Sequence, residues 1–300
     1  MTLLLGSLQQ GLVYALLGMG VYISFRVLGL PDLTTDGSFI FGMAVSAMLA
    51  IAGHPVLGLA GSLLAGALAG TVTGLLQTKA EIAPILAGIL TMFGLYTVNL
   101  AVQGNAPNLS LLGQETVFTL FARLPGVGAD GAKTLFPLLL CLLALVGLVW
   151  FLHTHAGLCL RATGSNESMV RASSINVDRT KVGGLALANA LIALSGGVLA
   201  QYQGFSDVTS GSGIVVIGLA SVIIGEVLFG RRSVNVGLLS AGVGAMLYRA
   251  VIALVLRYSI FPASALKLIS AAIVALALSL PALRRNLTQR RMRGEARRDA

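Results

Sequence analysis

The residue types that carry out enzymatic or metal chemistry are few in this chain of 300 residues, and their spacing does not suit it. The three histidines and two cysteines, Cys141 and Cys159, form no metal-ligand motif. His153 and His155 are two positions apart, which places them on different sides of a helix. The phosphate-binding pattern G-x-x-x-x-G-K-[S/T] does not occur. We therefore expect a chain that is not an enzyme and holds no metal or cofactor itself.

Polar side chains beside or inside apolar segments are better functional candidates, because burying them in lipid costs free energy. Arg249 and Glu226 lie within apolar runs, where they could pair with each other or contact a solute. Other polar residues stand near the ends of apolar runs, where they could line a path for a solute or only cap and cross-link helices. These path candidates are Asp32, Thr34, Thr35, Asp36, Ser38, Asn189, Gln201, Gln203 and Asp207.

The composition of the chain indicates the solvent that these segments require. Hydrophobic residues make up 56% of the chain and charged residues only 10%, whereas soluble domains carry about 25% charged residues. The net charge of +9 comes from basic residues next to apolar segments, which favours membrane topology over nucleic-acid binding. We therefore expect an all-α, polytopic membrane protein in contact with lipid and with no nucleic-acid partner.

The apolar stretches of the chain are long enough for about nine transmembrane helices. Helices are expected because each span must satisfy its own backbone hydrogen bonds in lipid. The predicted spans are 10–29, 37–53, 56–77, 83–103, 134–152, 183–203, 213–230, 236–257 and 265–282.

The distribution of lysine and arginine predicts the orientation of these spans. Basic residues concentrate in the tail 283–300 and in the loop 154–182, which we therefore place in the cytoplasm. Nine spans then put Met1 outside, and a re-entrant segment at 31–38 would reverse that end. We expect one transmembrane domain over residues 1–282, followed by the basic cytoplasmic tail.

Two short segments of the chain resemble each other. Residues 32–38 read Asp-Leu-Thr-Thr-Asp-Gly-Ser, and residues 207–213 read Asp-Val-Thr-Ser-Gly-Ser-Gly. Five predicted spans separate the two copies, so they run in opposite directions through the membrane. Inverted repeats of this kind occur in transporters, whereas chance recurrence of capping residues is the alternative.

The loop 154–182 is too polar to cross a membrane and too regularly patterned for a flexible linker. Ser165 or Asn166 can cap a short helix that has Glu167 in its first turn. Met169 and Val170, with Ile175 further on, give that helix a partial apolar face. Two short helices would suit docking into a groove on a soluble partner, or would lie on the inner leaflet.

Within this loop the pattern Arg161-Ala-x-Gly164-x-Asn166-x4-Arg171-Ala172-x2-Ile175-Asn176-Val177 resembles the cytoplasmic loop of ABC permeases of the branched-chain amino acid and ribose type. Segments 30–38 and 210–225 also resemble this family, in the same order, and the resemblance covers residues 6–282. Segment 30–38 is most similar to a subgroup paired with periplasmic binding lipoproteins, some of them linked with aromatic amino acids. The chain departs from the family at Ser174, where glycine is usual.

The resemblance implies that the chain is the permease subunit of an ATP-driven importer in the bacterial inner membrane. It implies a homodimer, an ABC ATPase that holds ATP and Mg²⁺, and a periplasmic solute-binding protein. The cargo would be a small polar solute such as an amino acid, moved into the cytoplasm. The alternative is an ion-coupled secondary transporter, which does not need a patterned cytoplasmic loop.

The same resemblance assigns the loop a coupling role, in which it sits in a cleft of the ATPase. Gly164 would permit a sharp turn, and Arg171 would face an acidic ATPase surface or only set the orientation. The coupling residues carried over are Gly164, Asn166, Glu167, Arg171, Ala172, Ile175 and Asn176.

Overall fold

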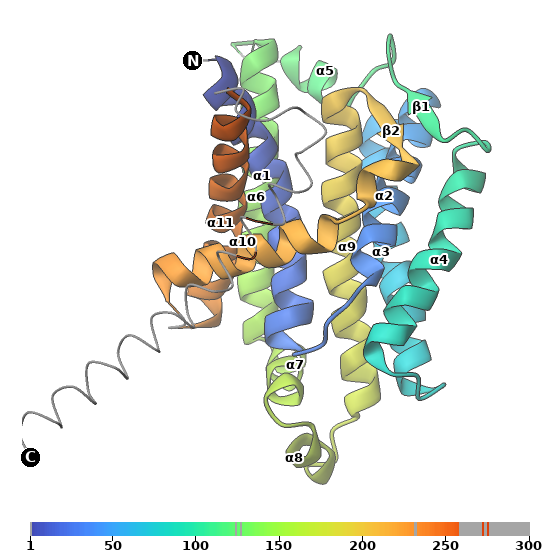
Figure 1. Cartoon of the computed structure of the whole chain (residues 1–300), viewed down its shortest axis with the longest axis vertical. Helices are drawn as coiled ribbons and strands as arrows, with labels where there is room; N and C mark the ends of the chain where they lie inside the picture. Colours follow the sequence, from blue (N-terminus) through green and yellow to red (C-terminus); the bar gives the residue numbers. More distant parts are fainter. Residues whose placement is uncertain are drawn as a thin grey trace, which may run out of the picture.

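The computed structural model describes residues 2–257, apart from 124, 127, 231 and 232, together with residues 272 and 275. It is a bundle of long helices with one very small sheet (Figure 1). Eight of the described helical segments are long and apolar enough to cross a membrane. They are built from α1 (Thr2–Tyr22) with its π-helical extension η1 (Ile23–Val27), α2 (Thr34–Ile51), α3 (Pro55–Thr78), α4 (Pro84–Val102), α6 (Ala129–His153), α9 (Val177–Gln203), α10 (Ile214–Phe229) and α11 (Val234–Arg257).

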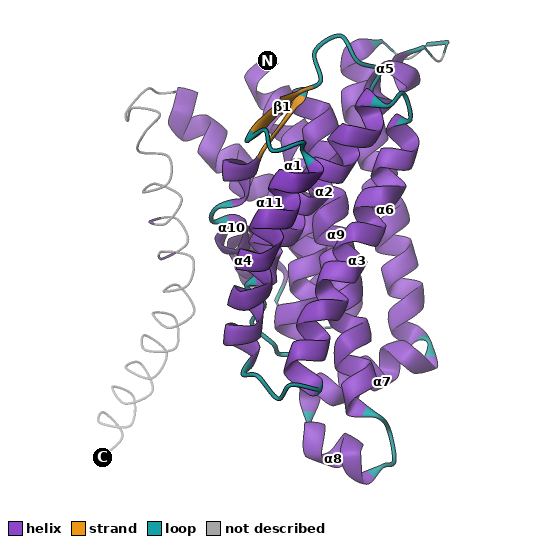
Figure 2. Cartoon of the chain, turned by 90° about the vertical axis from the view of Figure 1, so that its right-hand side faces the viewer, coloured by secondary structure: helices purple, strands orange, loops and turns teal. Residues whose placement is uncertain are grey.

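The remaining elements are short, and all of them except η2 lie at the two ends of the bundle (Figures 1 and 2). They are β1 (Asn108–Ser110), α5 (Val117–Ala122), α7 (His155–Ser165), α8 (Glu167–Ala172), β2 (Phe205–Asp207) and the 3-10 turn η2 (Val208–Gly211). β1 pairs antiparallel with β2, with Asn108 opposite Asp207. This pairing ties the segment after α4 to the segment after α9.

The all-α, polytopic prediction is confirmed, and eight of the nine predicted spans correspond to these long helices. The ninth, 265–282, and the tail 283–300 lie outside the described residues. Several helices are longer than their apolar stretch. α1 begins at Thr2 and α9 at Val177, several residues earlier than predicted. In α9 the extra residues are mainly polar and charged, whereas in α1 they include four leucines.

Helices α1 and α9 form the centre of the bundle, with 83% and 78% of their most apolar windows buried. α4 and α6 lie on the outside of the bundle (Figure 2), and their apolar side chains Phe93 and Trp150 are exposed. Apolar side chains on the outer surface suit a chain whose surroundings are lipid or another apolar surface. In α2, a Cβ at Gly42 would overlap the carbonyl oxygen of Ala193, so glycine permits α2 to pack directly against α9.

The two similar segments have matching local geometry, and each precedes or opens a long helix. The Asp32 carboxylate accepts a hydrogen bond from the Thr34 N–H at 2.9 Å, and Asp207 accepts one from the Thr209 N–H at 2.8 Å. In Figure 1, α2 runs along the bundle toward the end that carries β1 and β2, whereas α10 lies across the bundle at a large angle to α2. Both helices begin part-way along the bundle, an arrangement typical of the broken helices of transporters.

Candidate functional site

Helices α7 and α8 lie at the end of the bundle opposite the start of α1 (Figure 1). Each begins at a side-chain cap, as does α9 directly after them. Thr154 caps α7 by accepting from the Gly157 N–H, Asn166 caps α8 by accepting from the Met169 N–H at 3.1 Å, and Asn176 caps α9 by accepting from the Arg179 N–H at 3.0 Å. The cap proposed for Asn166 is therefore present. Three caps in succession define how the chain reverses from α6 into α9.

Gly164 has a different role from the one predicted. It lies inside α7, not in a sharp turn, and its φ is not positive. A Cβ at this position would overlap the carbonyl oxygen of Val27 at the end of η1. The prediction of a turn was wrong because the helix continues through Ser165. What glycine provides here is direct backbone contact between α7 and the end of the first span.

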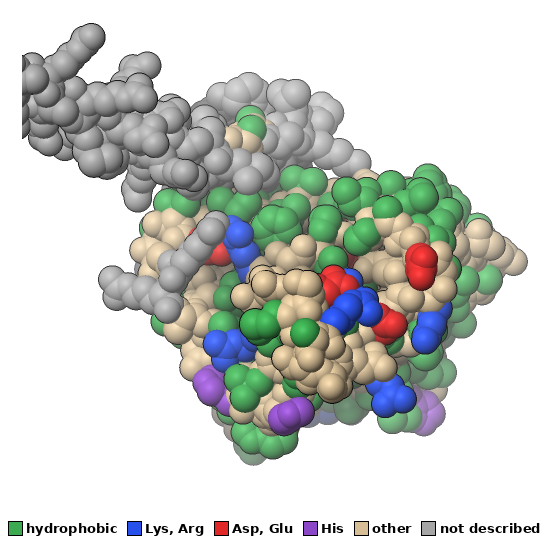
Figure 3. Space-filling model, turned by 90° about the horizontal axis from the view of Figure 1, so that it is seen from below, with side chains coloured by type: hydrophobic (Ala, Val, Ile, Leu, Met, Phe, Trp, Pro, Cys, Tyr) green, Lys and Arg blue, Asp and Glu red, His purple; other side chains and the backbone are tan. Residues whose placement is uncertain are grey.

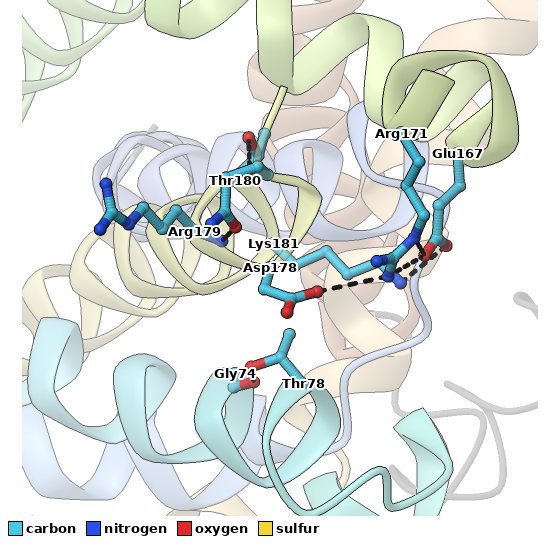
Figure 4. Close-up of polar contacts among 9 residues, drawn as sticks. Gly74, Thr78, Glu167, Arg171, Asp178, Arg179, Thr180 and Lys181 are labelled. Atoms are coloured by element: carbon cyan, nitrogen blue, oxygen red, sulfur yellow. Dashed lines mark hydrogen bonds and ion pairs between the residues drawn. The ribbon is translucent and has the colours of Figure 1, made fainter. Parts of the chain in front are cut away.

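Charged side chains connect α8 to the first turns of α9 (Figure 4). Glu167 accepts from the Lys181 ammonium at 2.7 Å and from the Arg171 guanidinium at 2.9 Å. Arg171 also reaches Asp178 at 3.3 Å. Arg171 therefore has carboxylate partners within its own chain, and they raise its pKa. Their negative charge also offsets the positive charge that Arg171 could offer to an acidic surface.

The tip of α8 presents small, uncharged side chains to the outside. Ser168, Met169, Ala172 and Ser173 are exposed, with Met169 55% exposed, whereas Val170 is buried against the rest of the chain. Figure 3 views this end of the molecule and shows acidic and basic side chains gathered beside the tip. A short, capped helix with an exposed methionine suits insertion into a groove on a partner.

Ser174 adopts a left-handed backbone with φ of 59°, a conformation that favours glycine. This conformation costs a residue with a side chain about 1 kcal/mol. We expect Ser174→Gly to stabilise the connection from α8 to α9 and to raise its amide-exchange protection about fivefold. Ser173, with φ of −87°, is the matched control, and Ser173→Gly should give no such gain. Equal gains from both substitutions would contradict the argument.

The pKa of Glu167 lies below its ordinary value of 4.5, chiefly because of the hydrogen bond from Lys181 and then that from Arg171. Its contribution to the stability of the connection between α8 and α9 is therefore fully present above pH 4.5 and is lost as the pH falls through the lowered pKa. Water screens a side chain that is 41% exposed, so the contribution stays below about 1 kcal/mol. We expect exchange protection in residues 166–178, corrected for intrinsic rates, to fall below pH 4.5. Glu167→Gln should remove this pH dependence, and an unchanged profile would contradict it.

A second group of predicted residues meets inside the bundle, where α2 and α9 pack together. The Asn189 amide donates to the Asp32 carboxylate at 2.7 Å and to the Leu185 carbonyl at 3.0 Å. The Thr35 hydroxyl donates to the Asp32 carbonyl at 3.0 Å. Asp32 and Asn189 are only 4% and 0% exposed, so this is a fully buried polar contact between helices distant in sequence.

Thr34 extends the buried polar contact toward α3 and α4. Its hydroxyl lies 2.8 Å from that of Thr73, which lies 3.0 Å from that of Thr91. Sequence reasoning missed Thr73 and Thr91, because a threonine in an apolar helix is a weak signal. Ser38 is also buried, and its hydroxyl has no hydrogen-bond partner among the described residues.

Asp36 holds the start of another helix. Its carboxylate accepts from the backbone N–H of Gly213 at 2.9 Å and of Val215 at 2.8 Å, at the beginning of α10. Asp36 thus connects the first of the two similar segments to the second, a relation that neither segment shows alone.

The other path candidates lie toward the end that carries β1 and β2, and they do not join the Asp32 contact. Gln201 accepts from the Val117 N–H and donates to Ser46 and to the Pro55 carbonyl. Gln203 donates to the Phe205 carbonyl, and Asp207 caps η2. In these positions Gln201 ties distant segments together, whereas Gln203 and Asp207 make only local contacts.

Arg249 and Glu226 have other partners than each other. Glu226 forms an ion pair with Arg26, two hundred residues away in the chain. The Arg249 guanidinium lies 3.7 Å from the centroid of the Tyr14 ring, within the range of a cation–π contact. Within the part of the chain that the structure describes, no three metal-ligating side chains gather at one place.

Comparison with known proteins extends these observations. Residues 3–278 match the family described as branched-chain amino acid transport system / permease component. A tyrosine transport system permease protein of Clostridioides difficile is 33% identical over 90% of this chain and 88% of its own length. The ribose import permease protein RbsC of Escherichia coli is 28% identical over 74% of this chain and 68% of its own. The solved structure of PsaBC from Streptococcus pneumoniae in complex with Fab aligns with a TM-score of 0.54 at 17% identity, covering 91% of this chain and 90% of that one, which supports the helix arrangement alone.

Proposed function

The chain belongs to the branched-chain amino acid transport system permease family, and we propose that it is the membrane-spanning subunit of an ATP-driven importer. The family consists of transport components, so the chain is a multi-pass membrane permease, and in the proposal a partner subunit hydrolyses the ATP. In the proposal, residues 1–282 form one transmembrane domain in the bacterial inner membrane, with the tail 283–300 in the cytoplasm. The solute is an amino acid, as the name of the tyrosine permease suggests, and it moves inward.

The observation that supports ATP coupling is the capped helix pair α7 and α8 with its exposed, uncharged tip. In the proposal this tip inserts into a groove on an ATPase subunit, which holds ATP and Mg²⁺. The contact is firm because the ion pairs of Glu167 fasten α8 to α9. Two permease chains would each contribute one such pair, and a solute-binding protein would deliver the solute at the opposite end.

The fold offers a direct route from this tip to the interior. α9 is one continuous helix from its cap at Asn176 past Asn189, so a movement of its first turns also moves the partner of Asp32. Gly164 transmits the same movement to the end of the first span through its backbone contact with Val27. ATP-driven closure would thereby shift α9 and α1 against α2, which is the kind of rocking that alternating access requires.

Reconstitution of the chain in liposomes tests the proposal. Uptake of labelled L-tyrosine should require the ATPase and the binding protein. It should also require ATP on the side of the membrane to which the ATPase is bound. Uptake by the chain alone, driven by an ion gradient without ATP, would overturn it in favour of a secondary transporter.

A further inference from the structure

A pocket of about 390 Å³ lies where η1, α7 and the beginning of α11 meet. η1 packs against α7, and Figure 1 shows the lower end of α1 next to α7. Two arginines line the pocket, Arg26 from η1 and Arg161 from α7, together with the hydroxyl-bearing Ser165. Leu158 and Val234 add apolar side chains to the lining. The pocket therefore combines two cationic groups with an apolar wall.

The ends of three membrane spans place this pocket at the membrane surface. Arg26 lies at the end of the span Leu5–Val27, α11 begins a span at Val234, and α7 directly follows the span Ala129–His153. Trp150, near the end of that last span, is 72% exposed, and tryptophan concentrates at the interface between lipid and water. The phosphate groups of lipids lie at this level, just beyond the apolar part of the bilayer.

The described charged side chains around the pocket sum to one positive charge. Arg26 forms an ion pair with Glu226 through its Nη2 atom, so its guanidinium has further N–H groups to donate. Its Nε is buried and has no acceptor among the described residues. Arg161 forms no ion pair within the part of the chain that the structure describes. Both guanidinium groups act electrostatically on the Tyr22 hydroxyl, so they face the same region.

We propose that this pocket binds the phosphate group of an anionic phospholipid. The guanidinium groups of Arg26 and Arg161 donate to the phosphate oxygens, since arginine suits phosphate in both charge and geometry. The start of an acyl chain lies against Val234 and against Leu158, which is 51% exposed. Basic pockets between membrane helices recognise anionic head groups in this way. The inference goes beyond the proposed transport function and does not depend on it.

The location of the pocket gives a bound lipid a structural effect. Gly164 also lines the pocket, and its backbone contacts Val27 at the end of the first span. A phosphate held by both arginines links η1 to α7 beside this contact. The lipid therefore fastens the end of the first span to α7.

The alternative is that these arginines only set the orientation of the chain, as basic residues at the ends of spans commonly do. Arg179 provides the comparison. It lies in the first turn of α9, and its side chain extends away from Glu167 and Arg171 (Figure 4). Like Arg161, it forms no ion pair with the residues that the structure describes, but it lies outside the lining of this pocket. A general effect of positive charge would involve Arg179 as much as Arg161, whereas binding in the pocket would not involve Arg179.

Native mass spectrometry of the full chain, released from detergent micelles after lipid titration, tests the inference with three probes. Phosphatidylglycerol carries a net negative charge, phosphatidylcholine with the same acyl chains is zwitterionic, and sn-glycerol 3-phosphate carries a phosphate without acyl chains. We expect phosphatidylglycerol to bind at least about fivefold more tightly than phosphatidylcholine, the factor that one basic residue near a lipid surface contributes. Glycerol 3-phosphate at the same concentration should not displace phosphatidylglycerol, because it cannot contact the apolar wall.

Two substitutions that remove the same charge locate the binding. Arg161→Gln should lower the affinity for phosphatidylglycerol about fivefold and bring it close to that for phosphatidylcholine. Arg179→Gln should change it by less than about twofold, because Arg179 lies outside the pocket. Arg161→Lys should restore most of the binding, since an ammonium group also pairs with phosphate. The preference of the unsubstituted chain for phosphatidylglycerol keeps the inference falsifiable where Arg161→Gln fails to fold.

Three results would overturn the inference. Equal binding of phosphatidylglycerol and phosphatidylcholine would mean that the pocket does not recognise the charge of the head group. Equal weakening by Arg161→Gln and Arg179→Gln would mean that net charge, and not this pocket, attracts the lipid. Displacement of phosphatidylglycerol by glycerol 3-phosphate would assign the pocket to a free phosphate compound instead of a lipid. The measurement uses neither ATP nor an ATPase, so its outcome is separate from the reconstituted-uptake test of the proposed function.

Discussion

Ala172→Trp is expected to lower ATP-driven uptake and ATPase copurification by about 30-fold or more, while the permease itself stays folded. Ala172 is the last residue of α8 and its side chain is exposed at the tip. An indole there has room in the free chain but would hold the tip out of a closely fitting groove. Loss of a central interface contact costs about 2 kcal/mol or more, which corresponds to that factor. Copurification and solute-stimulated ATP hydrolysis measure the effect.

The matched control is Ala129→Trp. Ala129 is also an exposed helix-terminal alanine, but it lies at the start of α6, whose other end leads into α7. We expect this variant to bind and stimulate the ATPase normally. Normal coupling in Ala172→Trp would remove α8 as the docking element. A bulky residue at Gly164 is less informative, because its overlap with Val27 would disturb the fold as well as the docking.

The parts of the structure that the sequence predicts are those set by local physical chemistry. Eight spans follow from apolar length, since lipid leaves no alternative to helix. The cap at Asn166 follows from an asparagine placed before Glu167 and a partial apolar face. The left-handed backbone at Ser174 lies at the one position where the loop departs from the pattern it resembles, in which glycine is expected.

The parts that the sequence could not predict depend on contacts between distant segments. Hydropathy alone would place the beginning of α9 after its charged residues. The helix nevertheless begins earlier, at Val177, where Lys181 in its first turns pairs with Glu167. The sequence shows no partner for Arg26 of η1, and only the fold reveals Glu226 of α10 as that partner. Likewise, Asp36 was a plausible cap for its own helix and instead holds the start of α10.

The path residues predicted from the sequence also fall into two groups, according to the partners that the fold gives them. Asp32 and Asn189 were selected separately as polar residues in apolar surroundings, and the fold brings them into direct contact. Gln201 satisfied the same criterion, but its amide is fully engaged by three neighbouring segments. Polarity within an apolar helix thus identifies a residue that needs a partner, and the fold decides whether that partner is a loop, a helix or a solute.

Asn189→Leu is expected to destabilise the chain by about 2–4 kcal/mol, the largest stability effect among these predictions. Leucine has a similar volume, so the loss comes from the Asp32 carboxylate, which would keep only the Thr34 N–H as a donor at a site 4% exposed. Thermal unfolding in detergent measures the effect. Gln203→Leu, at the half-buried end of the same helix, should change the stability by less than about 0.5 kcal/mol.

A second substitution separates the charge from the shape of this contact. Asp32→Asn keeps the volume and an oxygen for the Thr34 N–H but removes the buried charge, so alone it should cost about 1 kcal/mol. Combined with Asn189→Leu, it should recover part of the loss, because the unpaired group is then neutral. If the double variant is as unstable as the sum of the two single ones, the charge is not what Asn189 satisfies. Recovery would mean that α9 holds α2 through this carboxylate, so any movement of α9 driven from the α8 tip must act on Asp32.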